Sequence, residues 1–429
     1  MNILHVSALP IWPIQGKGGM PSLYETLEGH RRGGHTITVI LPQYGPFGDD
    51  PDRIEIPPGT EYEVYFAPCR WLSAVKEVRR AVKPAGGSQE IPFVFRWIIN
   101  MTVFKLLTIS LVLTAIRVKR RTRQKFDLIY AHNQYAALAG WILRFMFRVP
   151  NVTRLYGTFL ADLMNRPLVW LRYPTAAAGY LVPSRLLICG NDGTRGDEVA
   201  KKLKIQPQRF RFWQNGIDPP KAPLRITREE FLRRAPRNLR ADSVWICSCS
   251  RLSYWKRIDR IFQALRICRM QGQNAQVLLA GDGPERESLT KLARELDIEE
   301  NVVWLGAIPH DDIWAMMNLS DIFIITNDVT NRCNPLYEAI YASLPVVSIY
   351  DCSTQDLLKD GENALLADRE NVEQLGHCLV RLCQSPPLRE KLSQAQKSVA
   401  ATFWSWEERL AEEVRELEML VTQSPGGSR

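Results

Sequence analysis

Three short blocks in the second half of the chain combine cations, glycines and a carboxylate. Each follows an apolar, β-like run and precedes a helical pattern; the blocks are Ser250–Lys256, Ala280–Arg286 and Asn334–Ala339. In an open α/β sheet, ligands bind outside the carboxyl ends of the strands, where such turns gather. Two cations and one carboxylate at that edge suit a ligand with a pyrophosphate at one end and sugar hydroxyls at the other, as in a nucleotide sugar.

The two cations of the first block are Arg251 and Lys256. At an effective dielectric constant of about 20, a cation about 4 Å from a phosphate contributes about 4 kcal/mol of Coulomb energy. Together they could hold a diphosphate and stabilise it as a leaving group. Two cations in a loop are more often plain surface charges, so this interpretation depends on the other blocks.

The second block holds Gly281 and Gly283, followed by Pro284. Glycine allows a tight turn and a close approach of the backbone, and proline is favoured in the first turn of a helix. The two glycines are therefore candidates for a phosphate contact, although the same pattern is also a common turn.

The third block begins a helix, whose N-terminus offers free N–H groups and a partial positive charge. Glu338 would lie about one turn inside this helix and could accept hydrogen bonds from two ribose hydroxyls. A lone glutamate on a helix more often faces solvent. The donor-binding candidates of this block are Asn334, Pro335, Leu336 and Glu338.

Two features of the first half are further candidates. Gly18 and Gly19 belong to the run Gly16–Gly19, which follows the first strand but is neither a Walker loop nor a full dinucleotide fingerprint. Their backbone amides could approach a phosphate. His132 ends a predicted strand at its carboxyl edge, where it could hydrogen-bond a sugar or move a proton near neutral pH, or be an ordinary loop histidine.

Short apolar strands alternate with helical patterns along the whole chain, which predicts an α/β fold. The rhythm restarts after the polar stretch Pro219–Asp242, so two successive Rossmann-like units with parallel sheets are the simplest architecture, followed by an amphipathic tail helix over Phe403–Leu420. The predicted strands are Asn2–Ala8, Thr36–Leu41, Asp127–His132, Asn151–Gly157, Leu186–Gly190, Phe210–Gln214, Val244–Ser250, Gln276–Ala280, Val302–Leu305, Ile322–Thr326 and Val346–Ile349.

Composition narrows the class of protein. The chain has 429 residues, 45% hydrophobic and 24% charged, which indicates a globular protein of two or three domains. Its nine cysteines form no zinc-like cluster with histidine, so we expect core thiols, no metal site and a reducing cytoplasm. The N-terminus has the pattern of a strand rather than of a signal peptide.

The net charge of +9 is concentrated between Arg70 and Lys125, where 13 Lys or Arg face two Glu. Within this window, residues 94–116 are apolar and long enough to cross a membrane, but Arg96 and Lys105 would each cost about 2.5–3.5 kcal/mol inside it. Three alternatives stay open for this segment: a helix that covers the sheet, a helix whose outer side touches a bilayer, and a helix that spans a membrane. We expect an anionic membrane surface as the partner of residues 94–125. Nucleic acid fits poorly, because no aromatic residues are arranged there for stacking.

The combined blocks resemble the large retaining glycosyltransferase family four, whose architecture is GT-B. The similarity spans most of the chain and is strongest from residue 215 to residue 366. Ser250–Lys256 resembles the family's Arg/Lys phosphate pair, and Gly281–Arg286 resembles its Gly-Asp-Gly-Pro block. Leu155–Phe159 resembles its Leu-His-Gly-Thr-Phe stretch, with Tyr156 where histidine is usual.

The resemblance implies two facing Rossmann-like domains with a C-terminal crossover helix. Residues 1–219 would bind the acceptor, residues 220–402 the nucleotide sugar, and residues 403–429 would pack back on the first domain. It also implies transfer with retention from a UDP- or GDP-linked sugar to a glycan or lipid-linked acceptor, without a metal or other cofactor.

The resemblance assigns roles to single residues. Arg251 and Lys256 would neutralise the departing diphosphate, Glu338 would hold the ribose, and His132 would face the donor sugar. Gly18 and Gly19 would face the phosphates.

One position departs from the family pattern. Thr330 stands where the family usually has a second glutamate, eight positions before the ribose glutamate. Threonine cannot supply a carboxylate to the donor sugar. Asp328 is a candidate substitute, and backbone amides of an Asn-Pro variant of the loop are another.

Three functions fit these observations. The first is a glycosyltransferase at the cytoplasmic membrane face, peripheral to the membrane, in cell-surface polysaccharide or glycolipid assembly. Thr330 motivates the second, a catalytically silent scaffold subunit that binds a nucleotide sugar. The third is a GT-B sugar-nucleotide epimerase.

Overall fold

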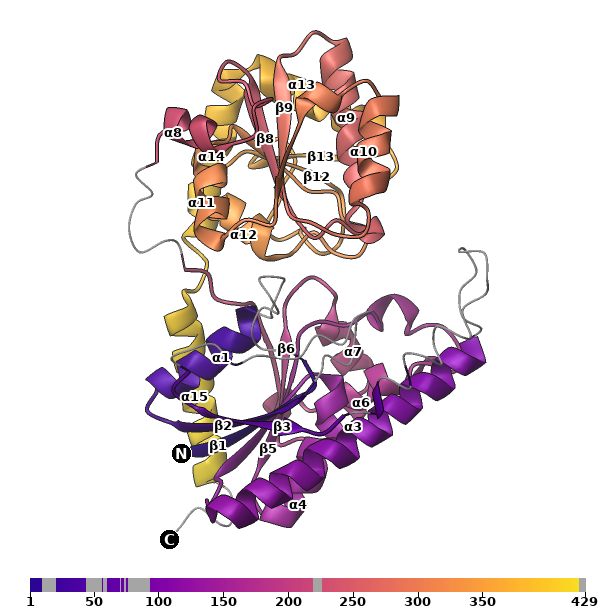
Figure 1. Ribbon diagram of the computed structural model, residues 1–429, viewed down its shortest axis with the longest axis vertical. Coiled ribbons are helices and arrows are strands. Elements are labelled where there is room, and N and C mark those ends of the chain that lie inside the picture. The colour runs from indigo at the N-terminus through magenta and orange to yellow at the C-terminus, as the bar shows by residue number, and fades with distance from the viewer. Residues whose placement is uncertain are drawn as a thin grey trace. The chain divides into compact units, whose positions relative to one another are not determined.

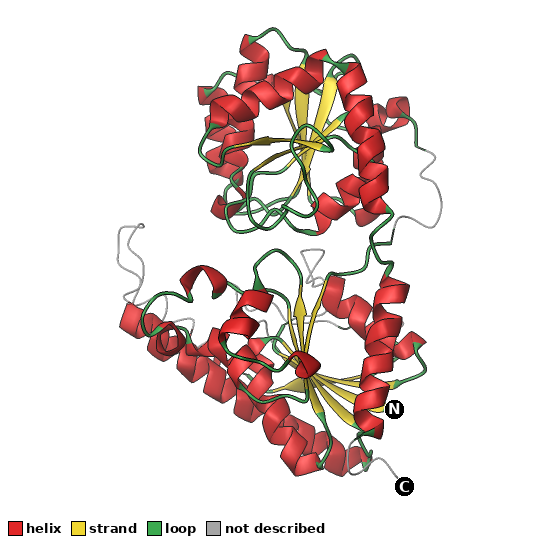
Figure 2. Ribbon diagram, turned by 180° about the vertical axis from the view of Figure 1, so that it is seen from behind, coloured by secondary structure: helices red, strands yellow, loops and turns green. Residues whose placement is uncertain are grey.

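The computed structural model describes residues 1–9, 21–43, 56, 60–69, 71–72, 75, 93–218 and 226–423. The chain divides into two compact units. Unit 1 comprises Met1–Gly216 together with Trp406–Arg429, and unit 2 comprises Ile217–Ser405. In each unit, helices cover both faces of a parallel sheet (Figures 1 and 2).

Unit 1 contains a seven-stranded parallel sheet with the strand order β3-β2-β1-β4-β5-β6-β7. The inner strands are short apolar or β-branched runs buried on both faces, as parallel sheets require, whereas the edge strands β3 and β7 are partly buried. Leu4 of β1 pairs with Thr38 on one side and with Ile129 on the other. The strands are β1 (Asn2–Ser7), β2 (Thr36–Pro42), β3 (Glu63–Ala67), β4 (Leu128–His132), β5 (Asn151–Leu155), β6 (Leu186–Gly190) and β7 (Phe210–Trp213).

The helices of unit 1 form two layers because side chains alternate across each strand. Ile3 packs into a core on the side of α1 and α15, whereas its neighbour Leu4 packs into a core on the side of α3 and α4. The helical elements are α1 (Pro21–Arg32), α3 (Phe93–Thr122), α4 (Gln134–Phe147), η1 (Ala161–Leu163), α5 (Val169–Arg172), α6 (Pro174–Leu181), α7 (Gly196–Lys202), η2 (Pro207–Arg209) and α15 (Trp406–Thr422).

The tail helix α15 belongs to unit 1 and lies beside α1 (Figure 1). The contact is close at Gly29, where an added Cβ would lie 2.3 Å from Cδ1 of Leu410. About two turns further along, Leu417 is fully buried in the core that contains Ile3. The prediction of a C-terminal helix that returns to the first domain is confirmed.

Unit 2 contains a six-stranded parallel sheet with the order β10-β9-β8-β11-β12-β13. Ile246 of β8 faces the core under α9, α10 and α13, whereas Trp245 and Cys247 face the core under α8, α11 and α12. Cys249 packs on the same side as Cys247, as the spacing predicts. The strands are β8 (Val244–Cys249), β9 (Ala275–Ala280), β10 (Val302–Gly306), β11 (Ile322–Ile324), β12 (Val346–Ile349) and β13 (Ala364–Ala367).

The remaining helical elements surround this second sheet. They are α8 (Arg228–Arg234), η3 (Tyr254–Lys256), α9 (Ile258–Met270), α10 (Arg286–Glu295), η4 (Glu299–Asn301), α11 (His310–Leu319), α12 (Asn334–Tyr341), α13 (Val372–Gln384) and α14 (Pro386–Ala400). All nine cysteines are free thiols. No group of three potential metal ligands occurs among the residues that the structure describes.

Candidate functional site

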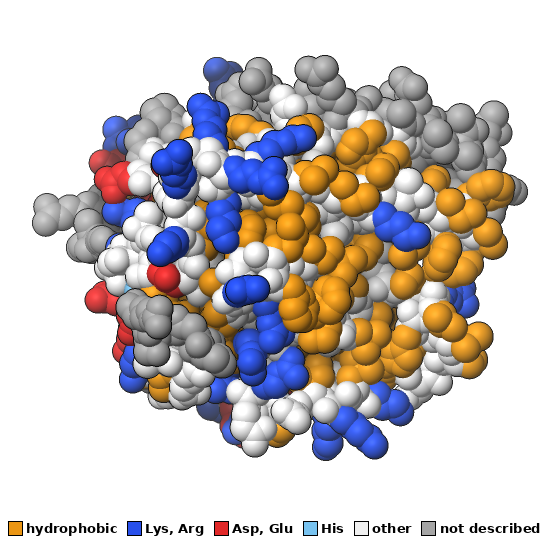
Figure 3. Space-filling view, turned by 90° about the horizontal axis from the view of Figure 1, so that it is seen from below, with side chains coloured by type: hydrophobic (Ala, Val, Ile, Leu, Met, Phe, Trp, Pro, Cys, Tyr) orange, Lys and Arg blue, Asp and Glu red, His pale blue; other side chains and the backbone are white. Residues whose placement is uncertain are grey.

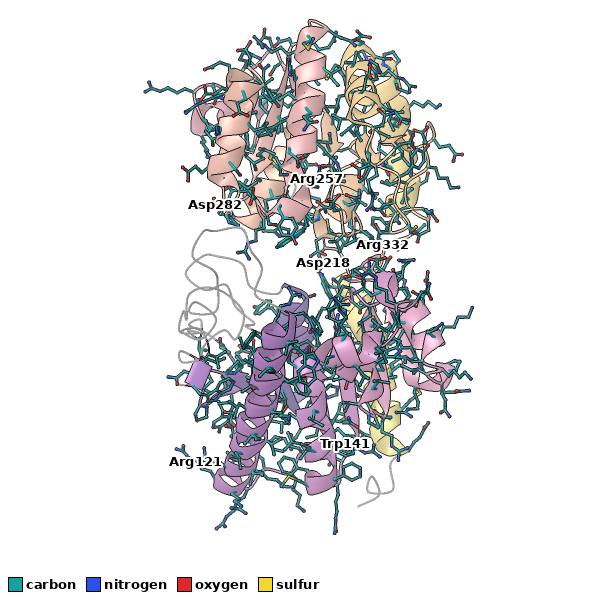
Figure 4. The ribbon with its side chains drawn as sticks, turned by 90° about the vertical axis from the view of Figure 1, so that its right-hand side faces the viewer. Arg121, Trp141, Asp218, Arg257, Asp282 and Arg332 are labelled. Carbon is teal, nitrogen blue, oxygen red and sulfur yellow. The ribbon has the colours of Figure 1, made fainter. Side chains whose placement is uncertain are left out.

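The three blocks predicted from the sequence meet at one edge of the unit 2 sheet. Strand β8 lies between β9 and β11, and the chain proceeds outward from β8 in one direction and from β11 in the other. This reversal is a topological switch point, where open α/β sheets bind their ligands. Arg251 and Gly281 lie in the loops that follow β8 and β9, and Glu338 lies on α12, the helix that follows the loop after β11. Figure 4 labels three further residues of these loops, Arg257, Asp282 and Arg332, at the same end of unit 2.

The glycines of the second block allow the loops after β8 and β9 to touch. Gly281 has a φ of +133°, and an added Cβ would lie 1.9 Å from the carbonyl oxygen of Ser250. At Gly283 an added Cβ would lie 2.3 Å from the carbonyl oxygen of Leu252. The amide of Leu252 in turn donates to the carbonyl of Asp282 at 3.0 Å. The two glycines thus join the cation-bearing loop to its neighbour.

The charges of Lys256 and Glu338 affect the pKa values of the same two thiols, those of Cys249 and Cys333. Burial raises the pKa of Cys249 above its ordinary value; the carboxylate of Glu338 raises it further, and the ammonium of Lys256 opposes the rise. Burial also raises the pKa of Cys333. There too, the charge of Lys256 lowers the pKa and the charge of Glu338 raises it. The charges of Lys256 and Glu338 therefore both lie near these two cysteines.

Arg251 and Lys256 differ from Arg257, Arg260 and Arg332, the ion-paired arginines of this edge. Within the described parts of the chain, neither of them forms an ion pair with a carboxylate. Arg257, by contrast, pairs with Asp259 at 2.9 Å and with Asp328 at 3.2 Å. Two unneutralised cations remain at the edge of the sheet, which suits an anionic ligand.

His310 is a site residue for which the sequence offered no motif. It opens α11, and its Nε2 lies 2.9 Å from Oε1 of Glu338, which is buried on α12. The hydrogen bond to Glu338 raises the pKa of His310 above its ordinary value of 6.5, although partial burial opposes the rise. The glutamate expected to hold a ribose is thus held in place by a histidine from the neighbouring loop.

The start of α12 is built differently from the expectation of an open helix N-terminus. Leu336 is fully buried in the core, and its amide donates to the carbonyl of Cys333 at 2.9 Å. Asn334 is exposed and Pro335 occupies the first turn. Contacts from Asn334, Pro335 and Leu336 to a donor stay predictions, and the amide of Leu336 would have to exchange partners to make one.

The loop before α12 is fixed by ion pairs and backbone hydrogen bonds. Asp328 accepts from Arg260 at 2.6 Å as well as from Arg257, so its charge is already compensated inside unit 2. Thr330 accepts from the amide of Arg332 at 3.0 Å, and Arg332 is buried and pairs with Asp356. Neither Asp328 nor Thr330 therefore offers an uncompensated carboxylate to a sugar.

In unit 1, His132 ends β4 beside β1, at the switch point of the first sheet. Asn133 follows it with a φ of +66° and caps α4 by accepting from the amide of Tyr135. The ring of His132 is fully buried; its Nδ1 lies 2.7 Å from the hydroxyl of Tyr156 and its Nε2 lies 2.9 Å from Nδ1 of His5. A direct contact of His132 with a donor sugar stays a prediction and would replace one of these hydrogen bonds.

The hydrogen bonds of His132 continue through unit 1 to α15. Nε2 of His5 lies 3.4 Å from Nδ1 of His30, whose Nε2 lies 3.2 Å from Oε1 of Glu413. A carboxylate only accepts, so a neutral His30 donates from Nε2 and accepts at Nδ1, and neutral His5 and His132 then do the same. Tyr156 then donates to His132. We call this series the histidine chain; it assigns the Nε2–H tautomer to all three rings.

Burial lowers the pKa values of His5 and His132, and three buried charges lie at the far end of the histidine chain. Burial alone would raise the pKa of Glu413, but the guanidinium groups of Arg154 at 3.2 Å and Arg409 at 2.9 Å outweigh it and hold that pKa well below its ordinary value. Burial, followed by the charge of Arg154, lowers the pKa of His132 well below 6.5. Burial and the neighbouring histidines also lower the pKa of His5.

Gly18 and Gly19, the glycines predicted to face the phosphates, lie outside the described residues.

Comparison with known proteins fits this geometry. Residues 230–399 match the family Glycosyl transferases group 1. The match lies within unit 2. The chain is 20% identical over 389 residues to the alpha-monoglucosyldiacylglycerol synthase of Acholeplasma laidlawii, covering 88% of this chain and 87% of that protein.

Two solved structures resemble the whole chain. Anabaena HepE in complex with UDP has a TM-score of 0.67 at 19% identity and covers 97% of this chain and 100% of its own. WaaG, a glycosyltransferase involved in lipopolysaccharide biosynthesis, has a TM-score of 0.66 at 16% identity and covers 99% of this chain and 100% of its own. The predicted GT-B fold of two Rossmann-like domains is confirmed.

Proposed function

We propose that the chain transfers a sugar from a nucleotide-sugar donor bound by unit 2 to a glycan or lipid-linked acceptor bound by unit 1. The observation that carries the proposal is the pair of unneutralised cations, Arg251 and Lys256, at the same switch point as the buried Glu338. We propose retention at the anomeric carbon, as in the family that the sequence resembles.

The geometry suggests how the donor would be handled. Two cations at the diphosphate would stabilise the charge that develops as the bond between the sugar and the phosphate oxygen breaks. Lys256 and Arg251 would supply this charge without a bound metal. Glu338, oriented by His310 at 2.9 Å, would accept hydrogen bonds from the ribose hydroxyls.

The comparisons support a choice of donor and acceptor for the first tests. HepE was solved with UDP, and the Acholeplasma laidlawii relative is a synthase of a glucosylated diacylglycerol. We therefore propose a UDP-linked hexose as the donor and a glycolipid or lipid-linked glycan as the acceptor, in glycolipid or cell-surface polysaccharide assembly. We place the reaction at the cytoplasmic face of a membrane, with unit 1 peripheral to it.

The direct test is a donor screen. The protein is incubated with UDP-, GDP- and ADP-sugars, with and without lipid extract, and the released nucleoside diphosphate is measured. We expect release of UDP that requires the acceptor extract. Well-folded protein that turns over none of these donors contradicts the proposal.

A second candidate is a catalytically silent subunit that binds a nucleotide sugar. It is favoured by the loop before α12, where Thr330 replaces the usual glutamate and Asp328 is compensated by two arginines. This candidate predicts UDP binding in calorimetry with no turnover under any acceptor condition. A sugar-nucleotide epimerase, the third candidate, would convert the donor without any acceptor, so a rate that depends on acceptor excludes it.

A further inference from the structure

Helix α3 has apolar side chains on the side that faces away from the sheet. Its inner side is the core of unit 1, where Leu107 and Leu111 are fully buried. On the outer side, Val94, Ile109 and Leu113 are 62%, 54% and 46% exposed. A helix that only covers a sheet is expected to carry polar residues there, so folding alone does not account for this outer side.

Helix α4 extends the same surface. It packs against α3 in unit 1, and its Phe145 and Met146 are 58% and 50% exposed. Figure 3 shows hydrophobic side chains gathered over a broad area of this face, with Lys and Arg around them and few Asp or Glu. We call the outer sides of α3 and α4 the apolar face.

The charge around the apolar face has a single sign. Helix α3 contains six Lys or Arg, α4 and α5 contain one each, and none of the helices α3, α4, α5 and α6 contains Asp or Glu. Arg117, Arg120 and Arg121 are exposed at the end of α3, and Arg121 lies at the same end of unit 1 as Trp141 of α4 (Figure 4). Soluble surfaces usually mix both signs.

A hollow near the start of α3 places two of these cations beside aromatic rings. Arg96 and Trp97 of α3 line it together with Arg172 and Tyr173. The guanidinium of Arg172 lies 4.7 Å from the ring centre of Phe93, and Trp97 donates from its indole nitrogen to the carbonyl of Leu171 at 2.9 Å. Amphipathic rings and arginines at the border of an apolar area are typical of a membrane interface.

The packing of α3 decides between lying on a membrane and crossing it. Its length and composition suffice for a span, but half of its most apolar window is buried against unit 1. Crossing would remove Leu107, Leu111 and their neighbours from the core around the sheet. The helix can therefore present only its outer side to lipid.

We propose that unit 1 docks on a bilayer of anionic lipid through the apolar face, with the cations of α3 at the headgroups. The biological role of this docking rests on the proposed function, since a lipid-linked acceptor would be presented at such a surface. Binding of the protein to lipid can nevertheless be measured without turnover. A soluble acidic partner would satisfy the cations but would leave the apolar side chains in water, whereas an anionic bilayer accommodates both.

Vesicle flotation with the full chain tests the docking. We expect binding to vesicles of phosphatidylcholine mixed with an equal part of phosphatidylglycerol, weak binding to phosphatidylcholine alone, and loss of binding at high salt. The triple variant Arg117→Gln, Arg120→Gln, Arg121→Gln removes three cations near the headgroups and is expected to weaken binding about 100-fold. Its charge-matched control changes three exposed cations of unit 2, Arg269→Gln, Lys291→Gln and Arg294→Gln.

A second variant tests the apolar contribution. Ile109→Ser with Leu113→Ser removes two exposed side chains of α3, and Met270→Ser changes an exposed side chain of unit 2 as the control. We expect weaker vesicle binding for the first variant only, with unchanged thermal unfolding for both. Three results would overturn the proposal. They are equal binding to both vesicle types, an equal loss of vesicle binding in the control variants, and a dimer in light scattering that the α3 variants abolish.

Calorimetry with UDP separates this proposal from the proposed function. The α3 variants should bind UDP as the wild-type chain does, because they change unit 1, whereas the proposed nucleotide site belongs to unit 2. Vesicle binding without any UDP binding would leave the docking intact and reject the proposed function. UDP binding without vesicle binding would reject the docking and leave the proposed function intact.

Discussion

At the residue scale, the donor site depends on Arg251 and Lys256, which have no carboxylate partner among the described residues. We predict that Lys256→Ala lowers the rate of nucleoside diphosphate release about 100- to 1000-fold, the range for removing one group that stabilises developing negative charge. Lys291→Ala, an exposed cation of α10, is the control and should leave the rate unchanged. The prediction fails if Lys256→Ala retains both the rate and the affinity for UDP.

The pair His310–Glu338 makes a second prediction at this scale. Because Glu338 raises the pKa of His310 above 6.5, the pair contributes stability that is fully present below pH 6.5 and is lost as the pH rises through the higher pKa of the folded state. In an NMR titration, His310 should titrate above 6.5 in the wild-type chain and near 6.5 in Glu338→Gln. The same titration in both proteins would show that the two groups do not interact in solution.

At the element scale, Gly281 allows the loops after β8 and β9 to approach each other. Gly281→Ala places a Cβ against the backbone of Ser250, which cannot move aside like a side chain, and should destabilise unit 2 by at least about 2 kcal/mol. Gly272→Ala is the control, since Gly272 also has a positive φ, +71°, but nothing lies within 4 Å of the added Cβ. It should cost about 1 kcal/mol. Urea unfolding measures the difference, and equal losses would mean that the contact is relieved by a shift of the loops.

The elements were largely predictable, because buried parallel strands are short apolar runs between helices. Leu186–Gly190 and Val346–Ile349 were predicted to the residue. The strands β3 and β13 were missed: Glu63–Ala67 is only partly buried, and Ala364–Ala367 has four residues that a propensity argument does not separate from a loop.

The candidate site was predictable only where a motif marks it. The three blocks of unit 2 stand at adjacent strand ends, as their positions after apolar runs indicated. The pairing of His310 with Glu338 joins residues 28 positions apart, and the pairing of His30 with Glu413 joins residues 383 apart. Contacts of this kind follow from packing, so no local pattern records them.

At the scale of the whole molecule, the histidine chain gives α15 a role beyond covering the sheet. Glu413 is fully buried, and it accepts from His30, Tyr130, Arg154 and Arg409 at once. Its charge therefore balances two buried guanidinium groups and also sets the tautomer of His132 through two intervening rings. Helix α15 is thus connected by hydrogen bonds to a predicted site residue in β4.

Glu413→Gln should consequently destabilise unit 1 and leave unit 2 unaffected. Loss of the carboxylate leaves Arg154 and Arg409 buried without a counter-charge, a change that typically costs about 3–5 kcal/mol. Glu412→Gln, one residue earlier on a more exposed side of α15, is the matched control. Hydrogen exchange followed by peptide mass analysis reports each unit separately, and equal loss of protection in both units would contradict the prediction.

The same buried groups predict how unit 1 responds to acid. His5 and His132 have pKa values below 6.5 in the folded state, so the unfolded chain binds more protons and stability falls as the pH drops below about 6.5. Glu413 has a lowered pKa, so its contribution is present above 4.5 and is lost as the pH falls further, through its folded value. Unit 1 should therefore lose protection from hydrogen exchange at a higher pH than unit 2, where His310 has the opposite sign. Replacing His5 by glutamine removes one of the histidines whose pKa is lowered, and the loss should shift to lower pH if the variant folds. An unshifted profile in a folded variant would place the acid sensitivity elsewhere.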